Sequence, residues 1–238
     1  MLLLAPRRLS LVLSAFGGLA GISFLLETPA ARRIAFPFIR RMVRARGAVM
    51  PAYILTGTPG AGKTAVLRLL ETLGYPVVEE AATDVIALGN ALGAEEPWRD
   101  HAFIDKVIAL QRQRQDAAQS SGSAVVFFDR SPVCTLALSR YLGRAASHLL
   151  IREVDRVLAA GTYETTVFFI RNQGFVQPTA ARRISFAESL AFERIHEQTY
   201  RDLGFRLVDV PTGPLTERVA LVQQIVGQPR LSQVPGVG

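Results

Sequence analysis

The residues whose types and spacing best fit a known chemistry are eight consecutive ones, the segment 57–64. They read Gly57, Thr58, Pro59, Gly60, Ala61, Gly62, Lys63 and Thr64. The glycines can adopt left-handed backbone conformations and carry no side chains, so successive main-chain N–H groups can turn toward one anion. The lysine can reach the β- and γ-phosphates of a nucleotide, and the following threonine hydroxyl can ligate Mg²⁺. This pattern predicts a site for the phosphates of a nucleoside triphosphate.

A phosphate-binding loop needs a strand before it and a helix after it. The apolar run 52–55 precedes the segment, and residues 65–70 follow it with the apolar spacing of a helix. Such a helix points the positive end of its dipole at the bound anion. The alternative is a glycine-rich turn that merely joins a strand to a helix, and the complete motif in its complete context favours the nucleotide site.

Strands and helices alternate along the rest of the chain. This order predicts an α/β three-layer sandwich of the P-loop NTPase type, with a mainly parallel sheet of about five strands and ligands beyond the strands' carboxyl ends. Further strands are expected over 75–78, 124–128, 165–170 and 206–210, and helices over 64–73, 82–92, 99–118, 132–142, 146–159, 186–202 and after Pro214. Within the helix 99–118, residues 111–115 (QRQRQ) read as a solvated face. Ser185 and Glu188 have the spacing of a capping box at the start of the helix 186–202.

Acidic residues end two of the predicted strands. Asp129 follows the apolar run 124–128, where an aspartate can hold Mg²⁺, and its alternative role is to cap the next helix. Glu79 and Glu80 end the strand 75–78, and alternation turns only one of them into a cleft. We take Glu80 as the catalytic candidate that accepts a proton from an acceptor hydroxyl, against the alternative of a solvated helix start.

Arginines offer a further set of candidates. Arg182 and Arg183 lie in the polar loop 171–184, from which they can close over the phosphates as a lid; a basic surface turn is the alternative. Arg130 follows Asp129 and faces the phosphates or solvent. The three histidines, His196 among them, lack metal-ligand spacing and are expected to be surface or packing residues. Cys134 is the chain's single cysteine and is assigned no chemistry.

The charge of the chain is unevenly distributed. The formal net charge is +7, but residues 1–50 hold eight arginines and one acid, so residues 51–238 are neutral. A neutral body lacks the broad basic surface that nucleic-acid binding requires. We therefore divide the chain into an extension over 1–49, a P-loop NTPase domain over 50–228 and a tail over 229–238.

The extension contains an uncharged apolar run over residues 9–26, at the lower limit of length for a membrane span. Arginines on its carboxyl side would keep the following domain in the cytoplasm. Three interpretations stay open: an upstream extension from a mis-assigned start, a membrane anchor and a targeting segment. We expect a cytoplasmic domain, tethered to a membrane only if residues 9–26 are retained.

Six segments resemble, in this order, the NadR-like AAA-type ATPase family, small P-loop proteins similar to nicotinamide-riboside and other nucleoside kinases. These segments are TGTPGAGKT, GYPVVEEAA, FFDRS, TVFFI, RRISFAES and YRDLGFRLVDVP, and the resemblance covers about residues 51–226. It implies that residues 57–64 bind ATP, that Asp129 serves Mg²⁺ or catalysis, and that Arg182 or Arg183 belongs to the lid. Thr83 and Cys134 depart from the family pattern at positions that would face an acceptor.

The sequence thus predicts a Mg²⁺- and ATP-dependent kinase that phosphorylates a small, nucleoside-like acceptor. Lys63, Mg²⁺ and the lid arginines would stabilise charge on the transferring phosphoryl group, with Asp129 or a glutamate orienting the acceptor hydroxyl. The alternative is a nucleotide-operated regulatory ATPase or binding module without a small-molecule acceptor, which the departures at Thr83 and Cys134 favour.

Overall fold

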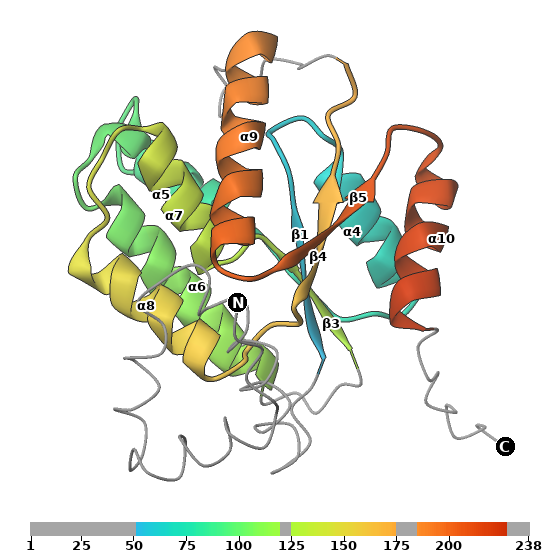
Figure 1. Cartoon of the computed structure of the whole chain (residues 1–238). Helices are drawn as coiled ribbons and strands as arrows, with labels where there is room; N and C mark the ends of the chain where they lie inside the picture. Colours follow the sequence, from blue (N-terminus) through green and yellow to red (C-terminus); the bar gives the residue numbers. More distant parts are fainter. Residues whose placement is uncertain (1–50, 120–124, 175–184, 228–238) are drawn as a thin grey trace, which may run out of the picture.

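A five-stranded parallel sheet lies at the centre of the computed structural model, which describes residues 51–119, 125–174 and 185–227 (Figure 1). The strands follow the order β2-β3-β1-β4-β5, and every neighbouring pair is parallel. The predicted α/β class and the predicted number of strands are confirmed. The strands are β1 (Ala52–Thr56), β2 (Val77–Val78), β3 (Val126–Asp129), β4 (Thr166–Ile170) and β5 (Arg206–Val210).

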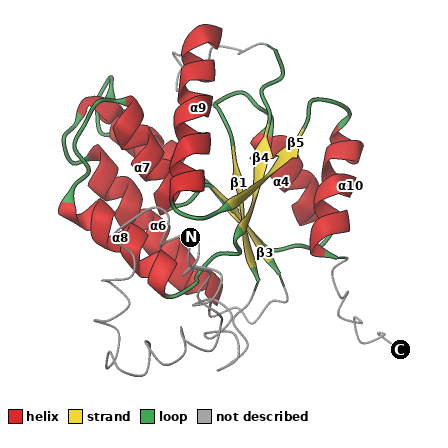
Figure 2. Ribbon diagram, viewed as in Figure 1, coloured by secondary structure: helices red, strands yellow, loops and turns green. Residues whose placement is uncertain are grey.

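Helices cover both faces of the sheet and make the structure three-layered (Figure 2). On one face lie α4 (Lys63–Thr72) and α10 (Leu215–Val226). The helices on the other face are α5 (Ala81–Ala91), α6 (Phe103–Gln119), α7 (Pro132–Tyr141), α8 (His148–Ala159) and α9 (Phe186–Asp202), together with the short 3-10 helix η1 (Pro97–Arg99).

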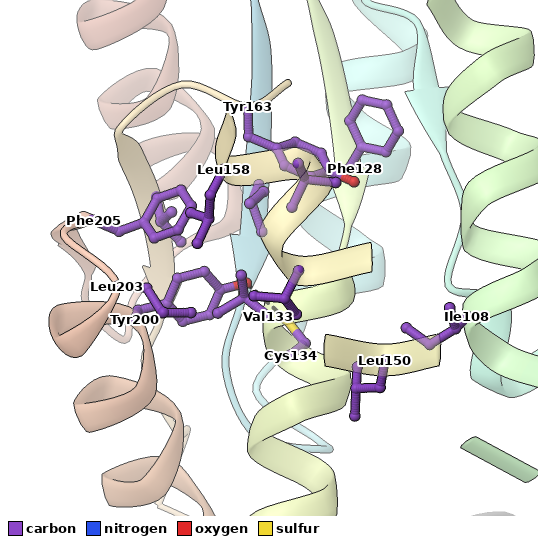
Figure 3. Close-up of a cluster of buried hydrophobic side chains, with 14 of the residues drawn as sticks. Ile108, Phe128, Val133, Cys134, Leu150, Leu158, Tyr163, Tyr200, Leu203 and Phe205 are labelled. Carbon is purple, nitrogen blue, oxygen red and sulfur yellow. Dashed lines mark hydrogen bonds between the residues drawn. The ribbon is translucent and has the colours of Figure 1, made fainter. Parts of the chain in front are cut away.

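Two apolar cores explain why the sheet needs both layers. One core packs β1, β3 and β4 against α4 and α10, with Leu55, Phe127 and Phe168 at its centre. The other packs the opposite sheet face against α6 to α9, and Figure 3 shows part of it around Tyr163 and Tyr200. Every residue of β3 and β4 is buried, which is why their sequences are continuous apolar runs rather than alternating ones.

The beginning of α9 is fixed by a capping box that the sequence predicts. The Ser185 hydroxyl accepts a hydrogen bond from the Glu188 main-chain N–H at 3.3 Å, and the Glu188 carboxylate accepts one from the Ser185 N–H at 2.8 Å. Two orphan N–H groups of the helix start are thereby satisfied. Helix α9 packs against α7, so the cap helps to fix the position of α9 beside α7.

The interpretation of residues 111–115 as a solvated face is wrong in part. Helix α6 begins at Phe103, after η1, and the side chains of Gln111 and Gln115 are buried. These two glutamines continue the inward face that Ile104 and Ile108 begin, so the helical spacing outweighs the polarity of the run.

Several predictions concern residues outside the described ranges. The extension 1–49, the tail 229–238 and the apolar run 9–26 all lie there. Among the described residues, no helix is long and apolar enough to cross a membrane.

Candidate active site

The loop 57–62 connects β1 to α4 and owes its path to glycines. Gly57, Gly60 and Gly62 have φ angles of 135°, 84° and 82°. A Cβ atom at Gly57 would lie 2.3 Å from the carbonyl oxygen of Ile170, so the neighbouring strand β4 leaves no room for a side chain. The predicted glycine-rich main-chain turn between a strand and a helix is therefore present.

Lys63 turns its ammonium group inward, against the loop that precedes it. Its Nζ donates hydrogen bonds to the carbonyl oxygens of Thr58 at 2.9 Å and Gly57 at 3.3 Å. Burial and the positive charge of Arg130 lower the pKa of Lys63 to about 8, while the charge of Asp129 acts in the opposite direction. The lysine is therefore a buried cation, and an anion bound next to it would stabilise its charged form.

Asp129 and Arg130 bring a second strand end to the same place. Asp129 is the last residue of β3, pairs in register with Leu55 of β1, and has a side chain only 7% exposed. Arg130 follows with a φ of 72°, the only positive φ among the described non-glycine residues, and its N–H donates to the Leu55 carbonyl at 3.0 Å. This unusual backbone conformation directs the chain from the sheet into α7, and such outliers concentrate at functional sites.

Glu80 and Arg130 form an ion pair next to the loop 57–62. The Glu80 carboxylate accepts a hydrogen bond from Arg130 Nε and another, at 3.0 Å, from the Thr83 hydroxyl. Burial disfavours the Glu80 charge, but Arg130 and Lys63 outweigh it and hold the pKa of Glu80 below its ordinary value. Burial is the largest single influence on Arg130 and disfavours its charge, but Glu80 and the other acidic groups nearby, Asp129 among them, together outweigh it and raise its pKa. Both groups are therefore ionised at neutral pH.

Of the two adjacent glutamates, Glu80 is the one that lines the cavity. Glu79 is exposed, and its carboxylate pairs with Arg68 on the surface of α4. Strand β2 ends at Val78 and Glu80 is the N-cap residue of α5, so the start of that helix, rather than strand alternation, separates the two carboxylates.

His196 contacts Arg130. The sequence predicts only a surface or packing residue at this position. The imidazole is fully buried, and its Nδ1 lies 3.1 Å from the Phe192 carbonyl oxygen, which can only accept. Nε2 is therefore left as an acceptor, and Arg130 Nη1 lies 3.5 Å from it. Burial and the charge of Arg130 lower the pKa of His196 to about 3, so the ring is neutral.

A cavity of about 740 Å³ opens beside the loop, lined by residues of the phosphate loop together with Glu80 and Arg130. Its opposite wall is apolar and aromatic. The polar side chains of Gln111 and Thr135 also line the cavity. The Thr135 hydroxyl donates a hydrogen bond to Gln111 Oε1 at 3.1 Å. The apolar wall consists of Ile86, Trp98, Phe103, Val107, Leu138, Tyr141, Leu142 and Phe192.

Cys134 lines the same cavity but is tied into a buried hydrogen-bonded cluster. Its Sγ lies 2.9 Å from the Tyr200 hydroxyl (Figure 3). The same Sγ lies 3.2 Å from Thr56 Oγ1. The Tyr200 hydroxyl also lies 2.8 Å from Ser131 Oγ. At this position, where the chain departs from the family pattern, it therefore has a packed thiol in contact with a tyrosine from α9.

The remaining predicted site residues divide into two groups. Thr64 is exposed at the start of α4 and lines the cavity, as do Pro59 and Gly60. Arg182 and Arg183 lie outside the described residues, so their predicted lid role stays a prediction.

Sequence reasoning missed two residues that hold the loop from its other side. The side chains of Arg218, in α10, and Gln173, after β4, both donate to the Ala61 carbonyl oxygen, at 2.8 and 3.4 Å. The sequence carried a weak signal for Arg218, because it adjoins Val219 on the inward face of the closing helix.

A known protein is similar to part of this chain in sequence. A protein of Frog virus 3 (isolate Goorha) named "Putative deoxynucleoside kinase" is 35% identical over 85 residues, which is 34% of this chain and 42% of that protein. The chain thus spans less than half of this curated relative's length.

The chain also matches two solved structures, and the first of them shows a similar fold. NadR protein in complex with NAD and AMP-PNP has a TM-score of 0.56 at 15% identity, over 79% of this chain and 52% of NadR. Thymidylate kinase from Candida albicans has a TM-score of 0.49 at 12% identity, over 76% of this chain and 92% of that one.

A family model described as an AAA domain matches residues 52–218, more than half of the chain and nearly the whole described sheet with its helices. The matched region includes the phosphate loop, both strand ends of the site and Arg218. The chain therefore belongs to this family of AAA domains.

Proposed function

We propose that this protein is an ATP-dependent phosphotransferase that transfers the γ-phosphoryl group to a hydroxyl of a small, nucleoside-like acceptor. One observation carries the proposal: the phosphate loop and the Glu80–Arg130 pair line the same cavity as an aromatic and aliphatic wall. A triphosphate tail on the loop would thus lie beside a space suited to a flat, partly apolar molecule. The name of the viral relative agrees with a nucleoside as the acceptor class.

The nucleotide side of the site supplies electrostatic stabilisation. The main-chain N–H groups of residues 60–64 and the Lys63 ammonium would hold the β- and γ-phosphates. Oxygen donors suited to Mg²⁺ are present as the Thr64 hydroxyl and the buried Asp129 carboxylate, and magnesium needs few protein ligands when phosphates supply others. Bound with the nucleotide, Mg²⁺ would neutralise charge on the phosphates.

The acceptor side supplies orientation. The ionised Glu80 carboxylate would accept a hydrogen bond from the acceptor hydroxyl and take its proton as the phosphoryl group transfers. Arg130 would hold Glu80 in place and add positive charge near the phosphoryl group. The amide of Gln111 and the hydroxyl of Thr135 could hydrogen-bond polar edges of the acceptor, while the aromatic wall excludes water.

The lid role of Arg182 and Arg183 completes the proposal. They follow β4 in the loop before α9, and closure there would shield the transferring group from water. Cytoplasmic location also remains part of the proposal, since the reaction needs ATP.

The test is an acceptor screen with the full chain. The protein is incubated with ATP and Mg²⁺ alone and with nucleosides and other small hydroxyl compounds, and ADP and phosphorylated product are both measured. We expect stoichiometric ADP and phosphorylated acceptor with at least one nucleoside. ADP release that no acceptor stimulates would instead support the regulatory ATPase and contradict the kinase.

A further inference from the structure

We propose that Arg218 is a positioning residue of the nucleotide site, which holds the Ala61 carbonyl and thereby aims the Gly62 N–H at the phosphates. The inference rests on the proposed function, because it deepens the role of the loop as an ATP site. The residue belongs to α10, more than 150 positions after the loop, so the claim concerns tertiary contacts and not the motif itself.

Arg218 is in an unusual position for an arginine. Its side chain is only 4% exposed, and its Nη2 donates to the Ala61 carbonyl at 2.8 Å. Its Nε has no hydrogen-bond partner among the described residues, and burial lowers the pKa of the guanidinium. Burying an incompletely satisfied cation is costly, so the arginine at this position is poorly explained by stability of the fold alone.

The geometry of the peptide bond converts this contact into an orientation. The described residues contain no cis peptide bond, and in a trans peptide the C=O and N–H groups point in opposite directions. With the Ala61 carbonyl held toward Arg218, the N–H of Gly62 points to the other side of the loop. Gly62 and Lys63 line the cavity whereas Arg218 does not, so that other side faces the cavity.

The fit around Gly62 supports the same role independently. A Cβ atom there would lie 2.8 Å from Arg218 Nη1 and 3.1 Å from Gln173 Nε2. Glycine at this position therefore permits two donor side chains to approach the loop closely, in addition to allowing the φ of 82°. The approach is specific to the peptide between Ala61 and Gly62.

The charge of Arg218 would strengthen the donor it orients. A hydrogen bond from a cation to a carbonyl polarises the peptide, and in a low-dielectric environment the N–H of that peptide becomes a stronger donor. Gln173 provides a second, longer hydrogen bond to the same oxygen. Arg218 thus contributes to phosphate binding through the main chain, without touching the nucleotide.

The experiment compares four variants of the full chain. Arg218→Met removes the charge and the donors at similar length, Arg218→Lys keeps the charge but not the fork, and Gln173→Ala removes only the longer hydrogen bond. Arg152→Met, at an exposed position of α8, controls for the loss of one positive charge. Amide hydrogen exchange of residues 60–64 is measured without nucleotide, and calorimetry measures the affinities for AMP-PNP with Mg²⁺ and for inorganic tripolyphosphate.

For Arg218→Met we expect a changed exchange rate at Gly62, because the peptide loses both its fixed orientation and its polarisation, and about tenfold weaker binding of both AMP-PNP and tripolyphosphate, the loss typical of one hydrogen bond involving a charged group. Arg218→Lys and Gln173→Ala should show smaller effects of the same sign, and Arg152→Met none. An effect on AMP-PNP without one on tripolyphosphate would contradict the proposal, because the residue would then recognise the nucleoside.

Failure of the inference and of the proposed function can be distinguished. Unchanged exchange at Gly62 and unchanged affinities in folded Arg218→Met protein would overturn the role of Arg218 while leaving the ATP site intact. If Arg218→Met does not fold, the same measurements on Arg218→Lys decide, and values there equal to those of the unaltered chain overturn the inference. If the unaltered chain binds neither ligand, the proposed function fails. The exchange of Gly62 then still decides whether Arg218 orients the peptide between Ala61 and Gly62.

Discussion

The two walls of the cavity are built in different ways. The wall that we propose binds the nucleotide, here called the nucleotide wall, is one continuous segment, residues 57–64, whose shape comes from the main chain and its glycines. The wall that we propose binds the acceptor, here called the acceptor wall, is assembled from side chains of α5, η1, α6, α7 and α9. A main-chain wall can be recognised from eight residues, whereas a side-chain wall depends on how five elements pack. If the two walls carry separate functions, a substitution on one wall should leave the function of the other unchanged.

The largest effect is expected on the nucleotide wall. Lys63→Ala should reduce turnover on the order of a thousandfold, the upper range for losing one electrostatic donor. The folded state of this variant should be no less stable than that of the unaltered chain. The substitution removes a buried cation whose pKa is already lowered to about 8. Steady-state kinetics and thermal unfolding check both statements. Lys106→Ala, at an exposed lysine paired with Asp100, is the matched control and should change neither.

On the acceptor wall, Glu80→Gln should lower kcat by about 100-fold, the typical contribution of a general base. The amide keeps the shape of the side chain but removes the charge that pairs with Arg130. Glu79→Gln alters the adjacent, exposed glutamate and should leave kcat within a factor of two, by the measure of exposed ion pairs. Equal losses in the two variants would show that the cavity does not distinguish the two carboxylates.

Behind the acceptor wall, His196 should make the fold sensitive to acid. Its pKa is about 3 in the folded protein, against about 6.5 in an unfolded chain. The unfolded state therefore binds the extra proton below pH 6.5, and stability falls as the pH decreases from there toward 3. Between pH 7 and 5 this group should cost about 2 kcal/mol of unfolding free energy.

Urea unfolding of the chain and of His196→Gln at the two pH values measures that difference. Glutamine can still accept a hydrogen bond from Arg130 but cannot take up a proton. The variant should lose about 2 kcal/mol less than the unaltered chain over the interval. The same loss in both proteins would rule out His196 as the titrating group.

A smaller effect is expected from the polar pair that lines the acceptor cavity. Gln111→Leu should raise the KM for the acceptor about tenfold, as expected for one lost hydrogen bond, while the KM for ATP stays unchanged. Gln113→Leu, at an exposed position of the same helix, controls for the change of composition. A rise in the KM for ATP would mean that the cavity holds the nucleoside part of the nucleotide.

The contrast between the walls also explains what the sequence predicts and what it does not. Local patterns predict the loop 57–64, the parallel α/β class of the sheet, the position of Asp129 at a strand end and the capping box at Ser185. Each of these features depends on neighbours within a few residues. Gln111 was misread because polarity was given more weight than its helical spacing from Ile104 and Ile108.

Other features depend on tertiary structure that no local pattern encodes. Arg130 pairs with Glu80 across fifty residues, and Arg218 reaches the loop across more than 150. His196 was expected to be a surface or packing residue because its neighbours along the chain say nothing about Arg130. Such contacts arise from the crossover connections of a parallel sheet, which bring distant strand ends to one edge.

The most direct test is a crystal structure of the full chain with AMP-PNP, Mg²⁺ and an acceptor found in the screen. We predict the β-phosphate within hydrogen-bond distance of the N–H groups of residues 60–64 and of Lys63 Nζ, and the acceptor hydroxyl beside Glu80. A nucleotide base occupying the aromatic cavity, or phosphates bound away from the loop, would contradict this account.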